Sequence, residues 1–234
     1  MKPKIICHIM SSVDGRLLNE RWTPLFDGKP FAEAGKAYAR AGASLGTQAW
    51  MFGKNTLQQG FFPTVFNHGG SPAARDFASW SGRRDSGRMF VVADPAGEIA
   101  YTAGTVRGDN IIAVLGEGVS ESYLEHLRRM GISYLFAGAD GCDLPLAMHR
   151  LRAEFGIETL SLQGGGIING AFLKAGLLDE LSLLIYPGID GLSGVPSVFE
   201  ALGTGGERRA AGGRAVAGAA ACRQAGVRRG KTAL

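Results

Sequence analysis

The sequence has few cysteines, and none is spaced for a disulfide or a metal. Cys7, Cys142 and Cys222 lie far apart in a chain of 234 residues and form no Cys-x-x-Cys pair. An odd, scattered set of this kind argues against a disulfide framework and against a structural zinc site. The four histidines show no ligand spacing either; they are His8, His68, His126 and His149. We therefore predict no metal site.

Long hydrophobic runs are also missing. No apolar stretch approaches the roughly 18 residues that a membrane-spanning helix needs. The apolar run near the N-terminus gives way after Met10 to the polar segment 11–15. It is too short for a signal peptide and has no small-residue cleavage site. We expect a cytoplasmic protein with no membrane segment.

The excess of positive charge is confined to one part of the chain. The net charge is +4, but residues 203–234 alone carry seven Lys or Arg and one Glu. Residues 1–202 are left with 18 basic and 20 acidic side chains, so this part is slightly acidic. A fold that binds nucleic acid usually presents a basic face. We therefore predict no nucleic-acid partner.

The last 32 residues lack the apolar side chains that a core needs. Of residues 203–234, 23 are Gly, Ala or Arg, and only Val216, Val227 and Leu234 are aliphatic residues larger than Ala. This composition predicts a folded domain over 1–202 and a disordered basic tail over 203–234. An altered reading frame of a GC-rich gene would give the same enrichment.

Apolar runs alternate with helical patterns through the rest of the chain, in which 45% of all residues are hydrophobic. Strands that are apolar on both faces, separated by helices of about three turns, indicate an α/β domain with a sheet covered on both sides. The predicted strands are 4–10, 48–52, 89–93, 111–115, 132–137, 157–162 and 181–186. The predicted helices are 31–43, 121–130, 144–155 and 167–175.

Two further expectations concern the surface. Residues 61–88 are rich in Gly, Ser, Pro and Arg and are too long for a simple connection. They are interpreted as a surface excursion or as a lid over a site. His126 lies beside Arg128 and Arg129 in a predicted helix, so it is predicted to be solvated.

The glycine run after the strand at 157–162 is the first candidate binding site. Gln163 precedes Gly164, Gly165 and Gly166, and a helix is predicted to begin directly after them. Glycine has no Cβ, so a bound group can approach the backbone closely. The unpaired N–H groups of the first helical turn favour phosphate. A tight strand–helix turn is the alternative, but it needs fewer glycines, and the run matches neither Gly-x-Gly-x-x-Gly nor a Walker A loop.

A second candidate follows the strand at 48–52. Gly53, Lys54 and Thr56 place a glycine, a cation and a hydroxyl at the strand end, where they could hold another part of an anion, such as a 2′-phosphate or pyrophosphate. Alone, this pattern is also an ordinary helix start. Two glycine-marked strand ends together predict one shared crevice at the C-terminal edge of the sheet.

A third candidate follows the first strand. Ser12, Asp14 and Arg16 place a hydroxyl, a carboxylate and a guanidinium at the end of a buried strand. Such a group could bind a polar substrate. Asp14 and Gly15 also form a common turn sequence, which is the alternative.

In this order, the motifs resemble the reductase domain of riboflavin biosynthesis, which has a dihydrofolate-reductase-like fold. That family has a Met-Ser-x-Asp-Gly turn, here 10–15 with one extra residue, and a Gly-Arg-x-Thr turn, here 53–56. It also has a strand ending in Asp, here Asp94. A Glu-Gly-Gly-Gly loop corresponds to 163–166, and a Gly-Leu-x-Asp-Glu-Leu strand entry to 176–181. The resemblance covers roughly 4–202.

The resemblance implies a three-layer dihydrofolate-reductase-like α/β fold with a central, mostly parallel sheet. The usual C-terminal strand pair is not expected, because 203–234 contain no strand pattern. It further implies NADPH as cofactor, hydride transfer to a small ribosylamino-pyrimidine phosphate, and a homodimer. The implied catalytic residues are Asp14 and Gln163. The implied substrate-binding residues are Ser12, Asp14, Arg16 and Gln163. The implied cofactor-binding residues are Gly53, Lys54, Thr56, Asp94, Gly164, Gly165, Gly166 and Ile167.

The chain departs from the family pattern in four ways. Gln163 stands where the family has Glu, and Lys54 where it has Arg, which exchanges a planar fork for a point charge. The Asp-Asp-Pro-x-Leu-x-x-Arg segment that contacts the substrate phosphate is missing from 57–75, and no zinc deaminase half is present. Two alternatives therefore stay open: a nucleotide-binding protein without turnover, and a reductase of another pterin or imine.

Overall fold

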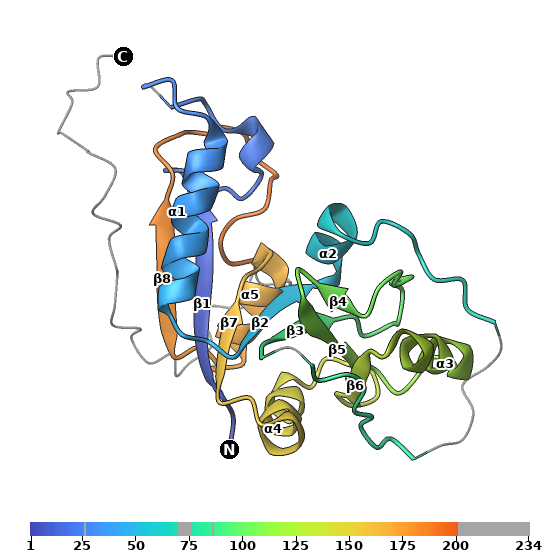
Figure 1. Ribbon diagram of the computed structural model, residues 1–234. Coiled ribbons are helices and arrows are strands. Elements are labelled where there is room, and N and C mark those ends of the chain that lie inside the picture. The colour runs from blue at the N-terminus through green and yellow to red at the C-terminus, as the bar shows by residue number, and fades with distance from the viewer. Residues whose placement is uncertain (26, 70–75, 86, 201–234) are drawn as a thin grey trace, which may run out of the picture.

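The described residues form one eight-stranded sheet. In this computed structural model they are residues 1–25, 27–69, 76–85 and 87–200. The strand order is β4-β5-β3-β2-β7-β1-β8, and β6 pairs with β5 (Figure 1). Every pair is parallel except β4 with β5. The strands are β1 (Lys4–Ser11), β2 (Ala49–Gly53), β3 (Met89–Ala93), β4 (Thr105–Val106), β5 (Asp109–Leu115), β6 (Ser133–Phe136), β7 (Thr159–Leu162) and β8 (Glu180–Ile185).

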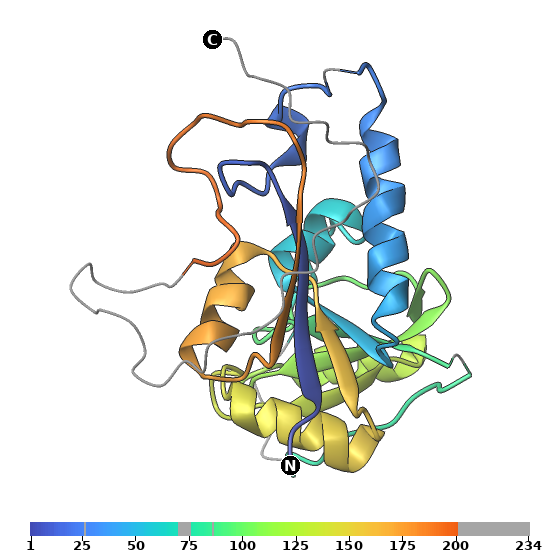
Figure 2. The ribbon, with the colours of Figure 1, turned by 90° about the vertical axis from the view of Figure 1, so that its left-hand side faces the viewer.

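Helices cover both faces of this sheet, so the protein has three layers (Figures 1 and 2). One face carries α1, α2 and α3, and the other carries α4 and α5. The helices are α1 (Phe31–Ser44), α2 (Lys54–Gly60), α3 (Glu121–Met130), α4 (Leu144–Phe155) and α5 (Gly166–Lys174), and a 3-10 helix spans Asn19–Arg21.

Two apolar cores lie on the two faces because side chains alternate along each strand. Val91 of β3 packs with the helices α4 and α5, whereas Phe90 and Val92 pack with α3. On β2, Met51 belongs to the first core, and Trp50 lies against the second. Strands that are apolar on both faces are what a doubly covered sheet requires. The predicted α/β fold with a mostly parallel sheet is therefore confirmed.

The helix ends follow from local sequence. Ser120 precedes α3, and its side chain accepts a hydrogen bond from the amide of Tyr123, while Gly131 ends the helix at a φ of 74°. Asp143 caps α4 in the same way, and Gly156 ends it at a φ of 71°. Both helices begin and end within a residue of the predicted bounds. The short helix α2 and the strand β4 were not among the predicted elements.

The described residues of the long segment at 61–88 run over the surface beside α3 and β6, as a surface excursion does. Its first part packs on α3, where the Phe66 and Tyr123 rings lie 5.0 Å apart. Its later part pairs with the outer strand β6 through a hydrogen bond of 2.9 Å from the Trp80 amide to Tyr134 O. The prediction that His126 is solvated is wrong: only 8% of it is exposed. Phe66 covers it at a ring distance of 5.0 Å, a long-range contact that helical periodicity does not reveal.

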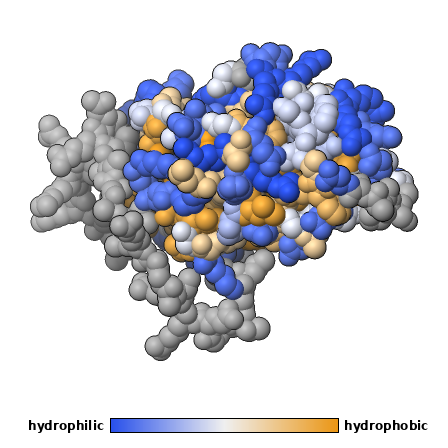
Figure 3. All heavy atoms as spheres, turned by 90° about the horizontal axis from the view of Figure 1, so that it is seen from below, coloured by the Kyte–Doolittle hydropathy of each residue, from blue (hydrophilic) through white to orange (hydrophobic). Residues whose placement is uncertain are grey.

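No helix of the described residues is both long and apolar enough to cross a bilayer. Seen from below, the surface shows apolar side chains interrupted by hydrophilic ones (Figure 3). The predicted tail at 203–234 lies outside the described residues, so its disorder and its lack of strands stay predictions.

Candidate active site

The two glycine-marked strand ends lie in contact. The amide of Gly53 donates a hydrogen bond of 3.0 Å to Gly164 O. The amide of Gly165 donates one of 3.1 Å to Thr56 Oγ1. The two strands β2 and β7 are parallel neighbours, with Met51 opposite Leu162, so both end at the same edge of the sheet. The shared corner expected from the sequence is therefore present.

The helix α5 begins at this corner. Gly165 precedes the helix, and no side chain of the described residues caps it. The first N–H groups of a helix have no partner within it, and together with the helix dipole they favour an anion. A Cβ on Gly166 would lie 2.2 Å from Ser197 O, so one side of the loop is covered by the chain at 195–200. Ile167 stays 46% exposed on the open side.

Lys54 lies at the corner but already has a partner. Its ammonium group forms an ion pair with Glu98, and 26% of the Lys54 side chain is exposed. The Lys54 ammonium group can contact an anion held at the corner only if its ion pair with Glu98 breaks or if it contacts both groups at once. The geometry therefore makes Glu98 a competitor of any bound phosphate.

Asp94 does not face the corner. It is fully buried, and its Oδ1 accepts a hydrogen bond from the amide of Glu98 while its Oδ2 accepts from the amide of Ile99 and from the Tyr123 hydroxyl. Burial raises the pKa of this carboxyl, although these donors and the charge of Lys54 oppose the shift. Asp94 thus holds the turn after β3 against α3, and both its oxygens are occupied.

Gln163 is held by side chains on the α1 face of the sheet. Its Nε2 donates to Ser161 Oγ at 3.1 Å, and its Oε1 lies 3.2 Å from the Tyr38 hydroxyl, which shares its one proton between Gln163 Oε1 and His8 O at 3.0 Å. Tyr38 stacks on His8, with ring centroids 4.2 Å apart. His8 is buried between Ser182 Oγ and Tyr38 O, and burial lowers its pKa, which favours the neutral ring. The amide of Gln163 is therefore fixed in orientation.

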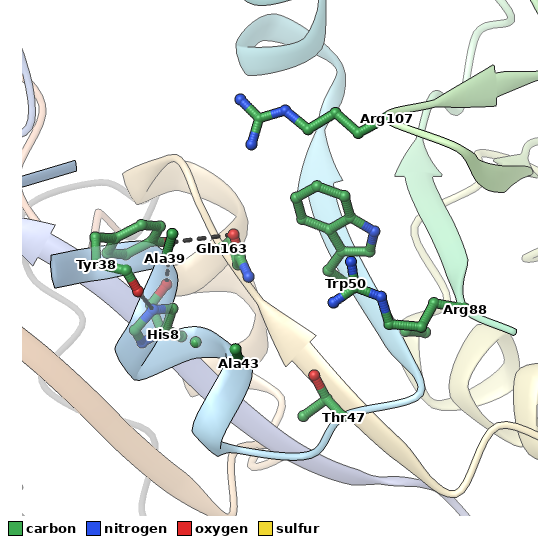
Figure 4. A pocket seen from close by; sticks show the side chains of 11 residues that line it. His8, Tyr38, Ala39, Ala43, Thr47, Trp50, Arg88, Arg107 and Gln163 are labelled. Carbon is green, nitrogen blue, oxygen red and sulfur yellow. Dashed lines mark hydrogen bonds between the residues drawn. The ribbon is translucent and has the colours of Figure 1, made fainter. Parts of the chain in front are cut away.

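A hollow of about 240 Å³ opens beside this amide, between α1 and β2 (Figure 4). Gln163, Tyr38 and His8 lie at one end. The other end holds Trp50 and two arginines, Arg88 and Arg107. The remaining lining residues are Ala39, Gly42, Ala43, Thr47 and Ala49.

The turn that follows β1 lies away from Gln163. Because Cys7 pairs with Leu162, Gln163 is level with His8, and Ser12 is four residues further along. At about 3.3 Å per residue this separates them by roughly 13 Å. The predicted substrate-binding group of Ser12, Asp14, Arg16 and Gln163 is thus not brought together, because β1 extends beyond the end of β7.

Asp14 and Arg16 instead hold the chain at 188–197. The Asp14 carboxylate accepts from the Ser12 hydroxyl at 2.6 Å and from the amides of Asp190 and Gly191. These hydrogen bonds hold the pKa of the Asp14 carboxyl well below its usual range. Arg16 Nη1 donates to Val195 O at 3.2 Å. The implied catalytic pair of Asp14 and Gln163 does not meet in this structure.

Sequence reasoning missed several residues of the hollow. Tyr38 and Trp50 lie inside predicted elements and belong to no motif, so only tertiary structure brings them to Gln163. Arg107 had a usable signal, since Arg107-Gly108 separates Thr105–Val106 from an apolar strand as a two-residue hairpin turn does.

Comparisons with known proteins match most of the chain to one family. The family model of the RibD C-terminal domain matches residues 3–206. The chain is similar in fold to RibD of Acinetobacter baumannii, with a TM-score of 0.56 and 17% identity over 85% of this chain and 49% of that one. It therefore spans about half the length of that protein. A pyrimidine reductase-like protein of Corynebacterium diphtheriae gives a TM-score of 0.56 and 14% identity over 85% of this chain and 80% of that one.

Proposed function

The chain belongs to the RibD C-terminal domain family, and we therefore propose that it is an NADPH-dependent reductase of the riboflavin-biosynthesis type. Its substrate is a ribosylamino-pyrimidine phosphate or a related small molecule. The observation that supports this most directly is the contact between the corner at 53–56 and the glycine loop at 164–166. Two strand ends that meet at a bare helix N-terminus suit the phosphates of a nucleotide.

The residues at the corner fit such a cofactor. The first-turn amides of α5, beginning at Gly166 and Ile167, offer donors without a side-chain cap. Gly53, Gly164 and Gly165 keep the backbone accessible, and Thr56 holds the loop through Gly165. Lys54, which is paired with Glu98, adds a positive charge at the corner. In this proposal the α5 amides and Lys54 hold the phosphates, the three glycines and Thr56 shape the loop around them, and Asp94 supports the site by ordering the turn after β3.

When bound, NADPH supplies the hydride. The protein then has to position the acceptor carbon and to control charge around it. Gln163 directly precedes the glycine loop, so its fixed amide is placed to orient the acceptor ring by hydrogen bonds. Ser12, Asp14 and Arg16 shape the far rim of the site by anchoring the chain at 188–197.

One observation favours a nucleotide-binding protein without turnover. Gln163 has no ionisable proton, and both ends of its amide are already bonded within the protein, to Ser161 and Tyr38. A carboxylate at this position would be a more effective partner for a positively polarised acceptor. Binding of NADPH without oxidation in the presence of pyrimidine or pterin acceptors would establish this alternative.

A matched pair of variants on α5 tests the corner. Ile167 is 46% exposed at the start of the helix, and Leu173 is 44% exposed near its end. Ile167→Asp places a carboxylate among the proposed phosphate donors, where it also suits the helix dipole, so the fold is retained. We expect it to weaken NADPH binding at least tenfold in a calorimetric titration, while Leu173→Asp leaves it unchanged. Equal affinities in the two variants would exclude the corner as the phosphate site.

The same titration decides the broader proposal. No binding of NADPH or NADH at micromolar protein would exclude a reductase. If NADPH binds, its absorbance is followed with pyrimidine and pterin acceptors to find the substrate. We also propose that residues 1–202 form one reductase unit and that the protein is cytoplasmic and a homodimer. Sedimentation of the full chain measures whether it is a dimer.

A further inference from the structure

Arg107 occupies a backbone conformation that few side chains adopt. It lies with Gly108 in the two-residue turn of the hairpin formed by β4 and β5, and Val106 pairs with Asp109 across it. The φ angles are 52° for Arg107 and 86° for Gly108. Turns of this type favour Asn, Asp or Gly at both positions, because L side chains are disfavoured at positive φ. An Arg at this position runs against local preference, which points to a task for its side chain.

The guanidinium of Arg107 is held over aromatic rings and not by a carboxylate. It lies 5.9 Å from the ring centroid of Trp50 and 5.6 Å from that of Phe61. Among the residues that the structure describes, no hydrogen bond or ion pair to Arg107 is found. Arg88, in contrast, lies 5.5 Å from the Trp50 ring and forms an ion pair of 3.1 Å with Asp109. The mouth of the hollow therefore carries one guanidinium whose charge is not neutralised.

The opposite wall leaves room beside Trp50. Ala39, Gly42 and Ala43 lie one turn apart on the same face of α1, and all three line the hollow. Ala39 and Ala43 lie across the hollow from Trp50, and Gln163 lies at its inner end (Figure 4). The small residues of α1 leave the space between this helix and Trp50 open to a ring. The volume of about 240 Å³ is too small for a dinucleotide and suits one ring with a short arm.

We propose that this hollow binds a planar ring that carries an anionic arm, with the ring between Trp50 and α1 and the anion, a phosphate or a carboxylate, at Arg107. Arg guanidinium groups pair with both kinds of anion in a planar, bidentate way. The ring edge then meets the amide of Gln163. The inference rests on the proposed function, because Gln163 joins the hollow to the glycine loop and makes the ring end the acceptor end.

Arg107→Gly is the variant that separates binding from folding. Glycine adopts positive φ without cost, so the turn is kept and its strain is relieved. We expect the variant to unfold at an equal or higher temperature than the wild type while losing anion binding. Arg129→Ala, which removes an exposed arginine from α3, is the control for net charge.

The ligands for calorimetry on the full chain are uridine 5′-monophosphate, p-aminobenzoylglutamate and uridine. We expect at least one anionic ligand to bind tenfold or more tightly than uridine, and which one identifies the anion. Arg107→Gly should remove that advantage and leave uridine unchanged, whereas Arg129→Ala should change neither. Equal binding of all three to the wild type, or an anion preference that survives in Arg107→Gly, would overturn the inference.

A separate titration with NADPH distinguishes the two proposals. Arg107→Gly should bind NADPH as the wild type does, because Arg107 lies away from the glycine loop. If the wild type binds no NADPH but shows the Arg107-dependent anion preference, the proposed function fails and the ligand class of the hollow stands. If NADPH binds and the anion preference is absent, the inference about the hollow fails alone.

Discussion

The amide of Gly165 donates a hydrogen bond of 3.1 Å to Thr56 Oγ1. This contact joins the glycine loop to the start of α2, two segments that lie 109 residues apart in the sequence. It fixes the loop from which α5 begins. Together with the hydrogen bond from the Gly53 amide to Gly164 O, it determines the geometry of the proposed phosphate site.

Thr56→Val should loosen this junction. The variant keeps the shape of the side chain but removes the acceptor, so the Gly165 amide loses its partner, at a cost of about 1–3 kcal/mol in the free energy of unfolding. Thr56→Ser keeps the hydroxyl and should lose much less. Urea unfolding measures the difference, and equal stabilities would show that the hydrogen bond contributes nothing.

Lys54 should discriminate between the two nicotinamide cofactors. Removing a charged donor to a phosphate costs about 1.5–3 kcal/mol, or tenfold and more in affinity. We expect Lys54→Ala to weaken NADPH more than NADH if Lys54 meets the 2′-phosphate, and Glu98→Gln to strengthen NADPH by releasing Lys54. Lys36→Ala breaks an exposed pair with Glu33 on α1 and is the control. Equal weakening of both cofactors in Lys54→Ala would assign Lys54 to a shared phosphate.

The sequence predicted those features whose cause is local. Ser120 and Gly131 bound α3 through a side-chain cap and a positive φ, and both signals can be read from neighbouring residues. The meeting of Gly53 with Gly164 was also predictable, because adjacent parallel strands end at one edge. Long-range packing was not. The burial of His126 under Phe66 comes from a distant segment with no pattern of its own.

The candidate site shows the same division. The glycine loop and the corner at 53–56 were found by motif, whereas Tyr38 and Trp50 required the packing of α1 across the sheet. Asp94 stands where the family motif has it, yet its side chain is fully buried. The sequence places Asp94 at the end of a strand, but the direction of its side chain depends on a hydrogen bond from Tyr123 of α3.

Two glycines of α1 should respond oppositely to alanine. A Cβ on Gly35 would meet nothing within 4 Å, whereas a Cβ on Gly42 would lie 3.0 Å from His8 Nε2. Gly35→Ala should stabilise the protein by about 0.5–1 kcal/mol, because alanine is the better helix former. His8 is held by Ser182 and cannot move away freely. We expect the free energy of unfolding of Gly42→Ala, measured by thermal unfolding, to be at least about 1 kcal/mol lower than that of Gly35→Ala.

Asp94 should make the protein less stable as the pH rises. Burial raises the pKa of its carboxyl in the folded state, so the folded protein holds this proton to a higher pH than the unfolded chain does. The stability gained from the proton is complete below the unfolded pKa of about 3.9 and is lost as the pH rises through the folded pKa. Asp14 has the opposite shift and contributes in the opposite direction.

Asp94→Asn isolates this contribution, because it leaves Asp14 and the other carboxylates in place. The side-chain NH₂ group of Asn replaces one carboxylate oxygen, which accepts either from the Glu98 backbone amide or from the Ile99 backbone amide and the Tyr123 hydroxyl. We therefore expect the free energy of unfolding to fall by about 1–3 kcal/mol. That loss should be largest at low pH, where the wild type keeps the Asp94 proton, and should shrink as the pH rises. The free energy of unfolding of both proteins is measured by urea at several pH values from 4 upward. A difference that stays constant or grows with pH would show that Asp94 is ionised in the folded protein throughout, with its charge stabilised by Tyr123 and the two amides against the cost of burial.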